Sequence, residues 1–227
     1  MKKIILILFL FLSCYIIYNL TEEKGLSCLV IGGNIADNEY IKSNNLIKNY
    51  NNTYIDKDYR IIDLINTIKY NEEKDLDNKK ISIHRLLKNT DILIISIGMN
   101  DLYYKLNTDT LNIYTYLNDM LNNMEILLNE INKYTYKKVI IIGYYNITNK
   151  HNDLFTYLNY KIKRITNKYH YEYLELNDIL KNNPSYLQNS NNFNLNNKWY
   201  NEISKIIVEK IKNYWYNIKR IYYYDLY

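Results

Sequence analysis

Glycine, proline, cysteine and histidine are all scarce in this chain. The shortage of cysteine and histidine limits the disulfides and metal sites that it can form. Its 227 residues include five glycines, one proline, two cysteines and three histidines. Cys14 lies in an apolar N-terminal run and Cys28 in an apolar run typical of a buried strand, so no disulfide is expected between them. Neither cysteines nor histidines show a zinc-ligand spacing. We therefore expect no metal and no cofactor.

The few glycines lie mostly where short apolar runs end. Four of the five sit just past such a run: Gly32, Gly33, Gly98 and Gly143. The runs at 27–31, 92–97 and 138–142 are rich in Ile, Leu and Val, as are strands that are covered on both faces. Because glycine is so rare here, this placement predicts backbone that turns tightly or approaches a ligand closely. A fourth strand is expected at 171–176.

Segments with helical periodicity alternate with these strands. They cover residues 59–69, 81–87, 108–133, 152–167 and 198–218. Thr108 or Asp109 is expected to cap the long helix. The sequence predicts a short helix or irregular segment over residues 39–50, and polar loops over residues 71–79 and 189–197. The alternation indicates an α/β domain with a parallel sheet and helices on both faces.

The N-terminus has the pattern of a targeting segment. Residues 1–20 join Lys2 and Lys3 to an almost unbroken apolar run, which indicates a signal anchor or a signal peptide. No small residue stands two positions before Cys14, which favours an anchor over lipid attachment. Because the lysines would stay in the cytoplasm, we expect a single-pass membrane protein with its domain outside, or a secreted one if the segment is cleaved. A linker (21–26), the domain (27–218) and a Tyr-rich tail (219–227) follow.

The charge balance points away from nucleic acid. A net charge of +5 is mild for this length and suits an anionic membrane surface better than a nucleic-acid footprint. The 28 tyrosines, many of them next to lysines, leave open a module that binds polyanions.

Three segments carry a resemblance to a known family. The central apolar run ends in Gly98-Met99-Asn100-Asp101, the first run ends in Gly32-Gly33-Asn34, and residues 191–200 read NNFNLNNKWY. In these blocks, over residues 27–211, the chain resembles the SGNH (GDSL-like) hydrolases. The resemblance implies a flavodoxin-like three-layer α/β/α sandwich with a mostly parallel sheet, in a secreted or surface esterase.

The positions that perform chemistry in that family are occupied differently here. Asn34 stands at the nucleophile position, Asn191 at the Asp position and Asn194 at the His position. Gly33 replaces the Asp before the nucleophile, and Asn100 stands at an oxyanion-binding position. A carboxamide cannot attack an ester, take up a proton near neutral pH or stabilise an imidazolium. Loss of the Ser or His alone costs a serine hydrolase about a millionfold in kcat.

From its position in the sequence, none of the three histidines is expected to replace the missing catalytic base. His84 lies before the central strand, His151 opens a helix, and His170 precedes the fourth strand at its amino end. We therefore expect an inactive pseudo-esterase that binds an acylated glycan, a lipid or another ester-bearing ligand. An active esterase with an unrecognised nucleophile is the alternative.

Overall fold

The structure is a computed structural model, and it places most of the chain. The residues that it describes are 25–32, 41, 43–52, 59–76, 79–108, 110–135, 137–146, 151–177, 179, 185, 187–189 and 192–224. Within this part, no helix is long and apolar enough to cross a membrane. Residues 1–20, where a signal anchor is expected, lie outside it.

A five-stranded sheet forms the centre of the domain. Its strands are β1 (Leu26–Ile31), β2 (Ile47–Asn52), β5 (Ile92–Ile95), β6 (Lys138–Ile142) and β7 (Glu172–Leu174). They lie in the order β2-β1-β5-β6-β7, and every neighbouring pair is parallel. This is the flavodoxin-like order, in which the chain starts near the middle and changes direction once.

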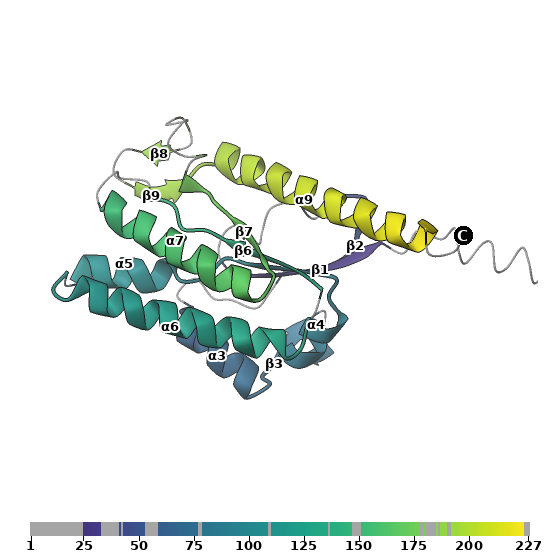
Figure 1. Cartoon of the computed structure of the whole chain (residues 1–227), viewed down its shortest axis with the longest axis horizontal. Coiled ribbons are helices and arrows are strands. Elements are labelled where there is room, and N and C mark those ends of the chain that lie inside the picture. Colours follow the sequence, from purple (N-terminus) through teal and green to yellow (C-terminus); the bar gives the residue numbers. More distant parts are fainter. Residues whose placement is uncertain are drawn as a thin grey trace, which may run out of the picture.

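Helices cover both faces of the sheet, which gives three layers (Figure 1). One face packs against α3 (Ile61–Lys69), α4 (Ile83–Asn89), α5 (Met99–Thr108), α6 (Ile113–Asn132) and α7 (Asn152–Lys168). The other face packs against α9 (Asn197–Tyr224) and Ile41. Successive residues of a strand point to opposite faces, so Leu29 and Ile31 join the first core while Cys28 and Val30 join the second.

The expected parallel sheet with helices on both faces is confirmed, and the four expected strands are all in it. The fifth strand, β2, starts within residues 39–50, where the sequence predicts a short helix or irregular segment. Its sequence, IKNYNN, is mostly polar. An edge strand is held by backbone pairing with its one neighbour and needs little apolar periodicity, so the pattern did not show it.

Short antiparallel hairpins overlap the two segments that are expected to be polar loops, and the first extends into the segment expected to be a helix from residue 81. In the first, β3 (Glu73–Leu76) pairs with β4 (Lys79–Ser82), and in the second β8 (Leu187–Asn189) pairs with β9 (Asn192–Leu195). Both hairpins are built largely of charged or amide residues. Alternation of apolar and polar residues, the usual signal of a strand, is missing from β3–β4 and runs for only four residues in β9.

The long helix expected at 108–133 begins later, at Ile113, so the expected cap is wrong, and a separate helix, α5, precedes it. Thr108 ends α5, and its hydroxyl donates a hydrogen bond to the Tyr104 carbonyl at 2.8 Å. The helix α6 starts after Asn112, whose left-handed φ of 55° interrupts the helical backbone. At the other end of the chain α9 continues past the expected end at 218 to Tyr224.

Candidate functional site

The strand order defines where a ligand would bind. In such sheets the crevice opens at the carboxyl ends of the two strands where the chain direction reverses, here β1 and β5. The two strand ends are close together, since the Ser96 N–H donates to the Ile31 carbonyl at 2.8 Å. Gly32 follows β1 with φ +101°, and a Cβ there would lie 1.9 Å from the Ser96 carbonyl oxygen. Only glycine fits this position.

Gly98 makes room for a buried tyrosine in the same way. Its φ is +99°, and a Cβ would lie 1.9 Å from the hydroxyl oxygen of Tyr144, which follows β6. Tyr144 is fully enclosed, and its hydroxyl has no hydrogen-bond partner among the described residues. Burial, with the nearby charge of Asp101, raises the pKa of this phenol well above its ordinary value. It stays protonated at physiological pH and cannot act as a nucleophile.

The two polar residues after Gly98 hold the start of α3. The side-chain amide of Asn100 donates to the Tyr59 carbonyl at 3.2 Å. The carboxylate of Asp101 accepts from the Ile61 N–H at 3.1 Å, which caps a helix that begins forty residues earlier in the chain. The residues after β5 therefore do two things: they form the first turn of α5, and their side chains hold the start of α3.

Asp101 serves as a structural cap in this position. Only 7% of its surface is exposed. Burial raises the pKa of its carboxyl, and the Ile61 N–H bond and the charge of Arg60 oppose this only in part. Its backbone carbonyl also accepts the Tyr116 hydroxyl at 2.9 Å. An aspartate just after a strand more often caps a neighbouring turn or helix than transfers a proton, and here the capped helix is α3.

Aromatic side chains gather where α9 begins, at the same edge of the sheet. Tyr145, next after Tyr144, packs edge-on against Trp199 with ring centres 6.1 Å apart. Burial raises the pKa of Tyr145 and of Tyr103, and the neighbouring Tyr200 adds to both shifts. These phenols remain neutral, so they contribute surface and hydrogen bonds rather than charge.

The segment just before α9 reaches this edge as well. Asn196 caps α9, since its side-chain oxygen accepts the Trp199 N–H at 3.2 Å, and its amide donates to the Ser185 carbonyl at 2.7 Å. The hairpin that precedes it, β8–β9, lies at the same end of the molecule as α5 and the start of α7 (Figure 1).

The structure places some of the candidate residues. Asn100 lies at the carboxyl edge beside Gly98. Asn194 is in β9, where its backbone is described and its side chain is not. Gly33, Asn34 and Asn191 lie outside the described residues. The convergence of the three asparagines on one pocket therefore stays a prediction.

The sequence pattern does not point to Asn159, although it is a central polar residue of this edge. Asn159 on α7 pairs with both backbone groups of Tyr144: its side-chain oxygen accepts the N–H at 2.9 Å and its amide donates to the carbonyl at 2.8 Å. The same side chain accepts the Tyr173 hydroxyl at 2.7 Å and donates to Glu175 at 3.1 Å. It thus continues the hydrogen bonding of β6 beyond the sheet. Asn is so common in this chain that nothing distinguished this one.

The histidines and Cys28 serve other purposes. His84 has its Nε2 2.6 Å from the Ile68 carbonyl and stacks on Tyr134 with ring centres 3.9 Å apart. His151 and His170 are exposed and have left-handed backbones, in turns before α7 and β7. Burial raises the pKa of the Cys28 thiol to about 12, so it is an unreactive core residue. Among the described residues no group of His, Cys, Asp and Glu could hold a metal ion.

The fold and this edge define the class of protein, a parallel α/β sandwich with a flavodoxin-like strand order. No model of a protein family matches the chain, and no curated protein matches it.

The contact between Gly98 and Tyr144 yields a test of the packing at this edge. Tyr144→Phe should leave the free energy of unfolding unchanged or raise it by about 1 kcal/mol, because it removes a buried hydroxyl without a partner. Gly98→Ala should lower it by about 3 kcal/mol, through the left-handed φ and the clash. Urea unfolding of both single variants and the double variant measures the coupling.

Because the clash is with the hydroxyl, Tyr144→Phe should recover part of the loss from Gly98→Ala. Gly32→Ala is the matched control: its Cβ meets the Ser96 backbone, so Tyr144→Phe should recover nothing there. Equal recovery for both glycines would contradict the contact.

The buried cap makes a prediction about pH. Asp101→Ala should lower the free energy of unfolding by about 1–3 kcal/mol, because the Ile61 N–H loses its acceptor. Asp101→Asn keeps an acceptor and should cost less. Since the folded pKa of Asp101 is raised, the folded state holds the proton more tightly. Wild-type stability relative to Asp101→Asn should therefore fall as pH rises from the ordinary carboxyl pKa through the folded one. Urea titrations across that range measure this, and a rise with pH would refute it.

Proposed function

We propose that this chain is a degenerate SGNH-type hydrolase domain that has lost hydrolysis and acts as a binding or accessory pseudo-esterase. The support is the Gly98-Met99-Asn100-Asp101 loop at the chain-reversal point of a flavodoxin-like sheet, which is where that family carries the equivalent block. The strand order agrees with the family's architecture, and an α/β sandwich of this order hosts many other activities too. The proposal therefore depends on the site residues more than on the fold.

The chemistry of the described edge supports inactivity. Asn100 and Asp101 are both engaged in holding α3, and Tyr144 is a neutral phenol in a closed space. None of them is poised to activate a nucleophile, which would need a base within hydrogen-bond reach. The candidate triad positions Asn34, Asn191 and Asn194 carry carboxamides, which supply neither nucleophile nor base.

The surroundings of the edge favour a ligand with both apolar and polar parts. The ring of Tyr145 and the buried ring of Trp199 pack behind this edge, and the half-buried Tyr200 beside them supplies the aromatic surface and hydroxyl group that sites for sugars and acyl groups use. An acylated glycan, a lipid or another ester-bearing molecule has this combination. We propose such a ligand, bound without being hydrolysed, for the carboxyl edge of the sheet.

The location of the domain follows from the N-terminal residues. With Lys2 and Lys3 in the cytoplasm, the domain would lie outside the membrane, tethered or released. Protease added to intact cells should then remove the domain from cell-associated protein, or the domain should be found in the medium. A domain that stays with the cells and is fully protected, but is digested after lysis, would contradict this topology.

Restoring the triad tests the proposed function directly. The unmodified protein should hydrolyse short-chain aryl esters no faster than the background rate. Asn34→Ser, Asn191→Asp and Asn194→His together should give measurable turnover, because they supply nucleophile, base and orienting carboxylate to a backbone of the family's type. The rate should be modest, since Gly33 replaces the family's Asp.

The single and double variants are the controls for this experiment. They should stay at background, because the three groups act as one unit. A triple variant that folds, as judged by circular dichroism, and still shows no turnover would count against the family assignment. Clear turnover by the unmodified protein that survives Asn34→Ala would overturn the claim of inactivity.

A further inference from the structure

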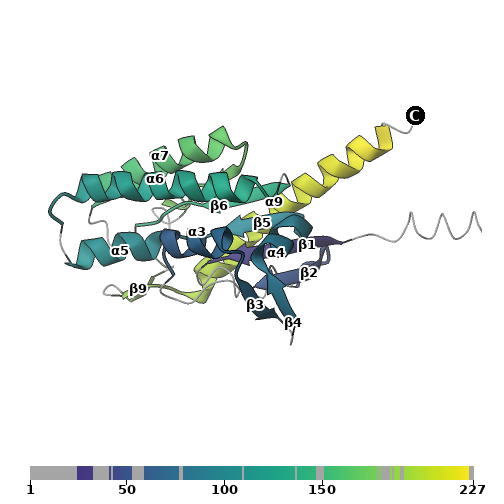
Figure 2. The ribbon, with the colours of Figure 1, turned by 90° about the horizontal axis from the view of Figure 1, so that it is seen from below.

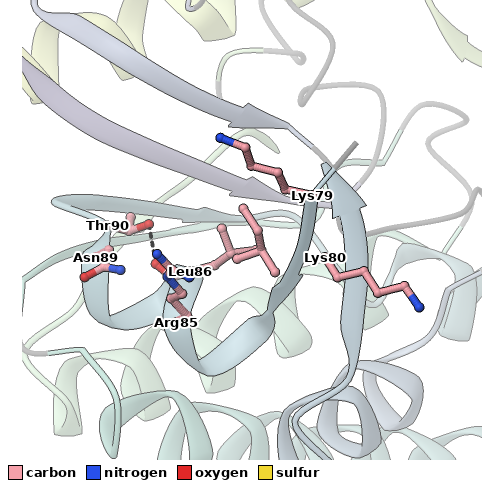
Figure 3. A pocket seen from close by; sticks show the side chains of 7 residues that line it. Lys79, Lys80, Arg85, Leu86, Asn89 and Thr90 are labelled. Carbon is pink, nitrogen blue, oxygen red and sulfur yellow. Dashed lines mark hydrogen bonds between the residues drawn. The ribbon is translucent and has the colours of Figure 1, made fainter. Parts of the chain in front are cut away.

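We draw no further inference here: the strongest candidate, the hollow beside β4 and α4 that Lys79, Lys80 and Arg85 line (its elements in Figure 2, its side chains in Figure 3), carries nothing because the described part of the structure does not show what occupies it.

Discussion

The hydrogen bond from the Ile61 N–H to the Asp101 carboxylate is the contact on which the carboxyl edge depends. It joins the loop after β5 to the start of α3, and the Asn100 amide reinforces it through the Tyr59 carbonyl. A buried carboxylate is costly, and the backbone donor at a helix start offsets that cost. Gly98 allows this arrangement, because its bare backbone lets Tyr144 pack against it.

This constraint has a chemical consequence for the site. The polar side chains of Asn100 and Asp101 are directed at the protein's own backbone. The same holds for Asn159, whose amide is shared among Tyr144, Tyr173 and Glu175. In the described part of the carboxyl edge, these polar side chains are thus engaged within the protein, and aromatic rings pack around the buried Trp199.

Much of the architecture could be predicted from apolar runs. The strands β1, β5 and β6 are central and covered on both faces, so burial alone requires Ile, Leu and Val in them. The strand β2 and the hairpins β3–β4 and β8–β9 could not be found in that way, because their stability comes from backbone pairing with a neighbour. The sequence places the start of α6 too early, because Thr108 and Asp109 are common helix caps and the left-handed backbone at Asn112 has no local sequence signal.

The sequence by itself determined the fold class, the role of Gly98 as a strand-end residue and the absence of the usual triad side chains. These depend on residue type and on the local period of burial, which are both visible along the chain. Tertiary structure alone decided which backbone groups Asn100, Asp101 and Asn159 bind, since their partners lie 41, 40 and 15 residues away. Contacts of this kind follow from the order of strands in the sheet, which no local pattern encodes.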